Sequence, residues 1–242
     1  MRAFLLLCLF GLAGCAIQTP HLAISRYPLA QQAVYYQEPL PYRVAVMPLA
    51  DQRPPLERQG QRPPGMFLLL WNRRVGDYYT SDRIFGDQVS QQLSRQLADY
   101  LQSAHVFAQT VATATVARNP DTIQRAGQDQ AADHVLGGEL QHFFGSQHQQ
   151  FSMFALPLYF ISAFGWQNGK GLPWGQTTIL FTLYQTRDGE LMWRHPMEQS
   201  WTMPRDTDSM AEAAMKSFAA TASQLAMELR QVSWSVPQTS SE

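Results

Sequence analysis

The apolar and polar positions along the chain predict alternating strands and helices. Tyr42–Leu49 (YRVAVMPL) is rich in apolar and β-branched residues and closes on a proline, which is typical of a buried strand. In Asp82–Ser103, with a cap at Ser81 or Asp82, apolar residues recur three and four positions apart, which predicts an amphipathic helix. The stripe is expected to face the core and comprises Phe85, Val89, Leu93, Leu97, Tyr100 and Leu101.

The alternation continues through the second half of the chain. Pro120 suits the first turn of a second, shorter helix, and Gly137–Gly138 predict an irregularity within the strand that follows. The segment Arg187–Glu190 predicts the turn of a hairpin. The strands are expected at His105–Ala108, His134–Phe144, Thr177–Tyr184 and Leu191–Trp201, and the helices at Asn119–Asp129 and from Asp206 or Thr207 onward.

This order of elements predicts an α/β fold of the α+β-like sandwich type, with about three helices packed on one mixed sheet of about five strands. We expect one domain at residues 42–232, interrupted by long insertions at 56–81 and 145–176. A tether with four prolines at 15–41 precedes it, and a polar, flexible tail at 233–242 follows it.

The first residues resemble the leader of bacterial lipoproteins. Arg2 precedes the apolar run Ala3–Phe10, which is too short for the about 20 residues that span a membrane. Leu12-Ala13-Gly14-Cys15 then resembles a lipobox, so residues 1–14 are expected as a signal peptide cleaved between Gly14 and Cys15, with palmitate or a similar acyl chain on Cys15. Because Ala16 rather than aspartate follows, the resemblance implies the periplasmic face of the outer membrane. An ordinary signal peptide or an uncleaved anchor is the alternative.

Five segments of the expected domain carry a second resemblance. They read VAVMPLADQRP, DQVSQQLSRQLADYL, HVFAQTV, ADHVLGGEL and LYQTRDGELMWRHPM. Together they resemble the periplasmic α/β domain of small outer-membrane lipoproteins: the curli secretion lipoprotein, the YajG-like group and the penicillin-binding-protein activator lipoproteins. These groups share a scaffold rather than an active site, so the resemblance transfers no functional residue. The two insertions depart from the pattern.

The second insertion contains the nearly uncharged run Phe151–Trp166 (FSMFALPLYFISAFGW). It is interpreted as a loop covering the sheet, as an exposed contact surface for a partner or the membrane, or as a membrane hairpin like that of the curli secretion lipoprotein. Pro157 and the lack of strict alternation argue against the hairpin. The candidate contact residues are Phe151, Phe154, Leu158, Phe160, Ile161, Phe164, Trp166 and, beyond the run, Trp174.

Composition narrows the classes of function. The formal net charge is −1 and no block of Lys and Arg occurs, which argues against nucleic-acid binding. Both cysteines, Cys8 and Cys15, lie in or at the edge of the leader. The expected domain therefore has neither a disulfide nor a thiol nucleophile.

The motifs of common active sites do not fit. The glycines around Lys170 lack the spacing of a phosphate-binding loop, and no hydrolase or zinc-protease motif occurs. His134 and His142 share strand parity but would lie more than about 20 Å apart on an extended strand, which is too far for one zinc ion. We therefore expect no catalytic residue, no metal and no cofactor.

These observations predict a non-enzymatic, lipid-anchored outer-membrane protein facing the periplasm, acting as an interaction or assembly subunit of a cell-envelope machine. Within the two insertions, segments 56–80 and 151–175 are the expected contact surfaces for a protein partner. One alternative is an accessory of lipid or solute transport that binds an apolar ligand beneath residues 151–166. The other is a subunit of a homo-oligomeric secretion pore.

Overall fold

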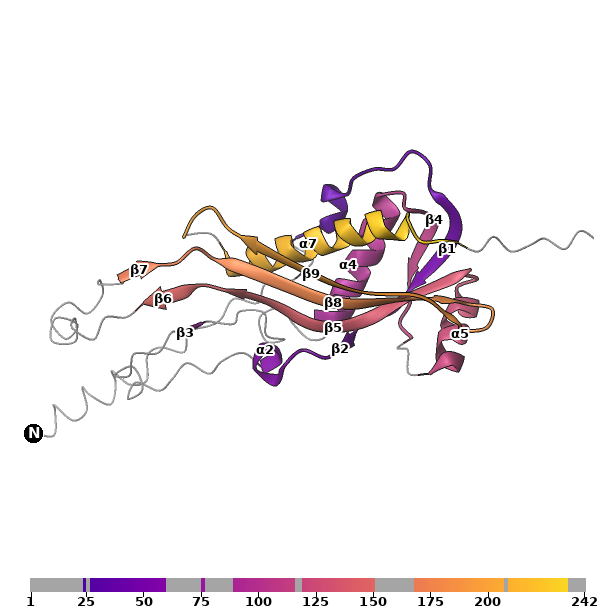
Figure 1. The fold of residues 1–242 in the computed structure, drawn as a ribbon, viewed down its shortest axis with the longest axis horizontal. Coiled ribbons are helices and arrows are strands. Elements are labelled where there is room, and N and C mark those ends of the chain that lie inside the picture. The colour runs from indigo at the N-terminus through magenta and orange to yellow at the C-terminus, as the bar shows by residue number, and fades with distance from the viewer. Residues whose placement is uncertain are drawn as a thin grey trace, which may run out of the picture.

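The structure is a computed structural model that describes residues 24, 27–59, 75–76, 89–115, 119–150, 168–206 and 209–234. Its main element is a mixed sheet with strand order β4-β1-β5-β8-β9, in which the short β2 also pairs with β5 (Figure 1). Pairing is parallel from β4 to β5 and antiparallel from β5 to β9. The strands are β1 (Leu40–Val46), β2 (Ala50–Asp51), β4 (Phe107–Ala112), β5 (His134–Ser146), β8 (Trp174–Gln185) and β9 (Leu191–Thr202).

Three helices cover the two faces of this sheet. The larger hydrophobic core joins one face to α4 (Val89–Ser103) and α7 (Met210–Leu229), whereas a smaller core joins the other face to α5 (Pro120–Asp129). Strand alternation explains the division, because Val44 and Val46 enter the larger core and Ala45 enters the smaller one. The expected α/β fold, with helices packed on one mixed sheet, is confirmed.

Several predicted elements occur where the sequence indicates them. Asn119 caps α5, because its side chain accepts a hydrogen bond from Thr122 N while the Thr122 hydroxyl accepts one from Asn119 N. The turn between β8 and β9 contains Gly189, whose φ of 72° suits glycine. The predicted stripe of α4 is buried from Val89 to Leu101, whereas Phe85 lies outside the described residues.

Other predicted boundaries were wrong. The first strand ends at Val46, and β2 is a separate strand that pairs with β5. The strand expected at His105 begins at Phe107, because His105 adopts a φ of 55° directly after α4. The last helix begins at Met210 rather than at Asp206 or Thr207.

The irregularity expected at Gly137–Gly138 is also displaced. The β5–β8 register shifts between Leu140 and His142, whereas pairing is continuous through both glycines. Gly138 instead permits close packing, because a Cβ atom there would lie 2.6 Å from the carbonyl oxygen of Leu180.

Part of the segment expected as a tether packs on the domain. The short 3₁₀ helix η2 (Leu29–Gln32) lies against α4, and Gln96 Oε1 accepts a hydrogen bond from Leu29 N at 3.1 Å. Ile24 and Leu29 are both buried in the larger core. The segment expected as a tether therefore includes residues that belong to the packed domain.

Trp234, expected in the flexible tail, belongs to the packed domain. Its indole N–H donates to the carbonyl oxygen of Leu229 at the end of α7. Its ring stacks on Tyr42, with 5.0 Å between centroids, and meets His134 edge-on at 5.0 Å. These contacts enclose His134, whose Nδ1 is buried without a hydrogen-bond partner among the described residues.

Strand β9 forms one edge of the main sheet. Pro196 lies in its middle, opposite Leu180 of β8. Proline has no backbone N–H and occurs in sheets mainly on edge strands, so its position agrees with the strand order.

Helix α7 lies directly against the backbone of β5 and β8. Gly145 and Gly175 are paired across these strands, and a Cβ atom at either position would overlap the backbone of α7, at Met210 and at Ala213 respectively. Thr177 is completely buried and its hydroxyl lies 2.7 Å from that of Ser217 on the helix. Glycine is required at both sites because helix and strands approach so closely.

Replacing Gly175 by alanine should therefore lower the free energy of unfolding by about 3 kcal/mol, because α7 must move off the sheet. Gly137→Ala is the matched control, since the one tight contact of its Cβ would be with the flexible end of Met47, at 2.9 Å, and the change should cost about 1 kcal/mol. Urea unfolding of both variants measures the difference. Equal losses would contradict the close approach at Gly175.

The enclosure of His134 predicts a pH dependence of stability. Burial lowers the pKa of His134 below its ordinary value of 6.5, although the charge of Asp133 acts in the opposite direction. The unfolded chain then takes up this proton at a higher pH than the folded one. The stability that neutral His134 contributes above pH 6.5 is therefore lost as the pH falls toward the pKa of His134 in the folded protein.

In His134→Phe, which keeps an aromatic ring beside Tyr42 and Trp234, this part of the pH dependence should disappear. Urea unfolding at about pH 7.5 and about pH 5.5 measures it, and the wild-type protein should lose more stability between the two conditions than the variant. Parallel losses in the two proteins would show that His134 does not carry the effect.

Candidate functional site

The β5–β8 hairpin continues beyond the main sheet. Strands β6 (His148–Gln150) and β7 (Asn168–Lys170) pair with each other, and β3 (Val75–Gly76) pairs with β6 in a second sheet of three strands. Figure 1 shows β6 and β7 extending past the end of α7, away from α5. We name residues 75–76, 144–150 and 168–176 the arm.

The arm joins the two insertions that the sequence places far apart. Val75 of the first insertion is paired with Gln149 of the second, and Gly76 with His148. The second insertion is in part a continuation of the hairpin, because β5 extends to Ser146 and β8 begins at Trp174. Strands β3 and β7, which lie in the two expected contact surfaces, thus belong to one sheet and are joined there by β6.

Trp174 is the one predicted contact residue that the structure describes. It is half-buried at the start of β8, and its ring meets that of Phe144 edge-on with 5.1 Å between centroids. Gly14, Cys15 and the candidates Phe151, Phe154, Leu158, Phe160, Ile161, Phe164 and Trp166 lie outside the described residues. Their roles stay predictions.

Gln147 ties the arm to the segment that leads into α7. Its buried side-chain amide donates to the carbonyl oxygen of Gly171 at 3.0 Å and to that of Asp206 at 2.6 Å. Buried polar groups with partners of this kind hold a segment in one geometry. The arm is therefore fixed to the domain at its base.

A second attachment holds the beginning of the first insertion. Glu57 lies in the short helix α2 (Pro55–Gln59), is 5% exposed, and accepts a hydrogen bond from His142 Nδ1 at 2.6 Å. Its other carboxylate oxygen accepts from the backbone N–H of Phe143 at 3.2 Å. We name Glu57, His142 and Phe143 the clamp, because together they fasten α2 to β5.

Next to the clamp, Arg53 is buried in an ion pair with Asp51. The guanidinium donates to both carboxylate oxygens of Asp51, at 3.0 and 2.8 Å, in the two-pronged geometry of strong pairs. Burial raises the pKa of Asp51, but the hydrogen bonds and the charge of Arg53 outweigh this effect and hold the pKa below its usual range. The pair therefore stays ionised near neutral pH and orders the chain between β2 and α2.

Sequence reasoning missed the clamp and the Asp51–Arg53 ion pair. It considered His142 only as a possible zinc ligand together with His134 and gave Asp51 and Arg53 no role. The only local signal is the spacing of Asp51 and Arg53 directly after a strand. The partners in the clamp are 85 positions apart, so no short motif could have revealed them.

The described residues contain no group of three or more His, Cys, Asp or Glu side chains that could hold a metal ion. His134 lies in the aromatic enclosure around Trp234 and His142 lies in the clamp, so the structure assigns them separate roles. Within the described ranges, no helix is both long and apolar enough to cross a membrane.

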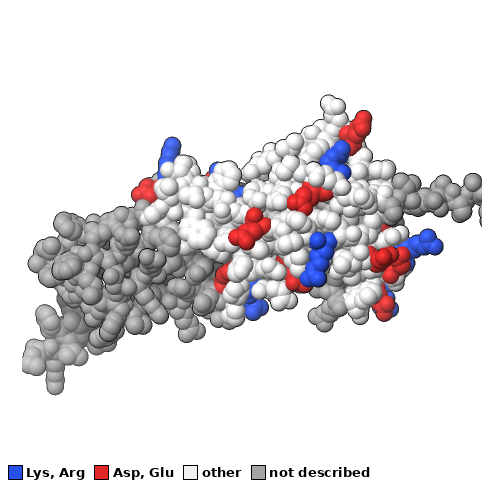
Figure 2. Space-filling model, in the orientation of Figure 1, with Lys and Arg blue, Asp and Glu red and all other residues white. Residues whose placement is uncertain are grey.

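Charge is sparse and mixed on the face of the molecule that Figure 2 shows. Lys and Arg side chains alternate with Asp and Glu side chains there, and broad uncharged areas separate them. No single-sign field covers this face. A contact on it would therefore depend on apolar and hydrogen-bonding groups more than on net charge.

Comparison with known proteins yields likeness at the level of fold. No protein-family model matches the chain, and no curated protein matches it in sequence. Protein XCC0632 from Xanthomonas campestris is similar with a TM-score of 0.44 and 11% identity, covering 82% of this chain and 88% of that one. The PelC dodecamer from Paraburkholderia phytofirmans gives a TM-score of 0.40 and 13% identity over 80% of this chain and 93% of that one.

Lipoproteins are also among the similar structures. Lipoprotein GNA1162 from Neisseria meningitidis gives a TM-score of 0.34 and 11% identity, covering 77% of this chain and 99% of that one. The likeness to small lipoproteins with an α/β domain, expected from the sequence, is thus found among solved structures. These proteins assign no role to any residue of this chain.

The clamp can be tested through Glu57→Ala. This change removes the carboxylate that accepts from His142 and from the N–H of Phe143, and hydrogen bonds to a charged group are strong, so the free energy of unfolding should fall by about 1–3 kcal/mol. The amide of Phe143 should also exchange faster with solvent, as hydrogen–deuterium exchange measures.

Glu198→Ala is the control, because Glu198 is an exposed residue whose carboxylate accepts from Gln176. The free energy of unfolding of this control variant should fall by no more than about 0.5 kcal/mol. A loss in Glu57→Ala as small as that in the control would mean that the clamp does not hold α2.

Proposed function

We propose that this chain is a non-enzymatic lipoprotein of the outer membrane that faces the periplasm and presents the arm to a protein partner, as an interaction or assembly subunit of a cell-envelope machine. The observation that carries this proposal is the union of two distant insertions in the arm through the pairing of β3 with β6. Long insertions in compact domains are often functional, and here both converge at one end of the hairpin.

The fixed base of the arm supports a role in binding. Gln147 and the clamp hold the arm and α2 in defined positions before any partner arrives. A contact surface that is already ordered loses less conformational entropy on association, which improves affinity without additional contacts. The hydrogen bonds at the base therefore suit a surface that is used for recognition.

The lipid anchor defines where this recognition takes place. Acyl chains on Cys15 would hold the chain on the membrane, since each buried CH₂ contributes about 0.8 kcal/mol. Because Ile24 is already buried in the domain, the extended tether from Cys15 reaches at most about 30 Å. The domain would then stay close to the membrane surface and meet partners in or near that membrane.

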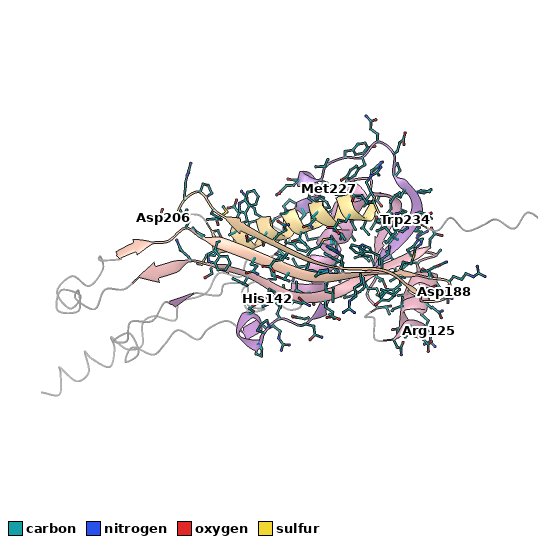
Figure 3. All side chains as sticks on the ribbon, viewed as in Figure 1. Arg125, His142, Asp188, Asp206, Met227 and Trp234 are labelled. Carbon is teal, nitrogen blue, oxygen red and sulfur yellow. The ribbon has the colours of Figure 1, made fainter. Side chains whose placement is uncertain are left out.

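Site-specific photocrosslinking in cells tests the proposal. Asp206 and Asp188 are both exposed, and Figure 3 shows them at opposite ends of the molecule, with Asp206 at the end that carries the arm. A photoreactive residue at position 206 should give one discrete adduct with an envelope protein, whereas the same residue at position 188 should give none. Immunoblots of irradiated cells measure both.

Two further variants make the result specific. Gln150 and Asn168 are directly paired, so an Asn-Gly turn can replace residues 151–167 without opening the arm. In this variant the adduct at position 206 should be lost while the domain stays folded. Cys15→Ser should abolish palmitate labelling and membrane fractionation. Adducts that form equally at both positions, or that survive the turn replacement, would contradict the proposal.

A further inference from the structure

A cavity of about 280 Å³ opens beside α7, apart from the clamp. Residues of η2, α4, α7 and β9 line it. Four of them lie on one face of α7, because they recur at intervals of three and four residues. The lining residues are Gln32, Tyr100, Trp201, Lys216, Ala219, Ala220 and Ser223.

One wall of the cavity is aromatic and accessible. Trp201 is 43% exposed at the end of β9, although it lies on the face of that strand where Met197 is buried beneath α7. The small side chains of Ala219 and Ala220 leave the space open. An exposed tryptophan beside a cavity offers a flat apolar surface against which a ring can lie.

Tyr100 contributes a phenol group to the lining of the same cavity. The residue is only 2% exposed, so the surrounding elements hold it in place. Its hydroxyl can both donate and accept a hydrogen bond. A hydroxyl or carbonyl group of a ligand in the cavity could therefore bond to it.

The charges at the cavity are balanced. Lys216 Nζ lies 3.5 Å from a carboxylate oxygen of Glu212 and 5.8 Å from the centroid of the Trp201 ring. The other polar side chains, Gln32, Tyr100 and Ser223, are uncharged and can both donate and accept hydrogen bonds. This combination favours a neutral ligand rich in hydroxyl groups over an isolated anion.

We propose that this cavity binds one neutral, pyranose-sized sugar residue of a glycan. The ring would lie against Trp201, and its hydroxyl groups would bond Tyr100, Ser223 and Gln32. The volume of about 280 Å³ lies just below the range of about 300–1,000 Å³ for ligand pockets, which suits a single ring rather than an acyl chain. None of the lining residues belongs to the arm.

Calorimetric titration of the full chain, purified in a zwitterionic detergent, tests the proposal. The probes are the neutral trimers maltotriose, cellotriose and chitotriose, with trigalacturonate and short-chain phosphatidylglycerol as the acidic alternatives. At least one neutral trimer should bind and should shift the indole N–H resonance of Trp201, which Trp201→Phe identifies.

Tyr100→Phe removes only the hydroxyl and should weaken sugar binding about fivefold, because one hydrogen bond to the sugar is lost. The midpoint of thermal unfolding should not fall. A purely structural role would leave the affinity unchanged. Trp201→Ala should abolish binding. Trp193→Ala is the matched control, since Trp193 lies on the same face of β9, stacks on His195 and does not line the cavity.

Three outcomes would overturn the proposal. The first is that no neutral trimer binds. The second is that only trigalacturonate or phosphatidylglycerol binds, which would make the cavity an anion or lipid site. The third is neutral binding that Trp193→Ala weakens as much as Trp201→Ala. None of these results bears on the crosslinks formed at position 206, so the two proposals can fail separately.

Discussion

The close contact between α7 and the β5–β8 hairpin is the constraint on which the rest of the structure depends. It is possible because Gly145 and Gly175 are paired across the strands and leave room for the α7 backbone, at Met210 and at Ala213 respectively. Ser217 donates to the carbonyl oxygen of Ala214, so the Thr177 hydroxyl donates to Ser217 and adds a buried polar contact. A helix seated this tightly sets the path of both strands on either side of the contact.

The same constraint positions both proposed sites. Toward one end, β5 and β8 leave α7 and continue into the arm, so the direction of the arm follows from where the helix lies. Gly175 is also directly paired with Trp201, which places that ring beside α7 at the cavity. A shift of the helix would therefore disturb the arm and the cavity together, although the two surfaces share no lining residue.

Local patterns predicted much of the fold, and long-range contacts account for what they missed. The capped start of α5 at Asn119 and the turn around Gly189 depend on neighbouring residues, so the sequence reveals them directly. The pairing of Val75 with Gln149 and the bond between Glu57 and His142 form only when distant segments meet. Composition led to the expectation of a tether before β1 and a flexible tail after α7. It could not show that Leu29 enters the core or that Trp234 packs against it, because an isolated apolar residue has no periodicity.

Pro196 in the outermost strand has a consequence for how copies of this protein can associate. An exposed strand edge is a template on which a foreign strand can add backbone hydrogen bonds, the usual route to fibrillar aggregates. A proline in the middle of β9 removes one donor from that template and breaks the ladder that an incoming strand would need. The proline thereby disfavours association of two copies through the edges of their β9 strands, and an ordered assembly on this side would depend on side-chain contacts.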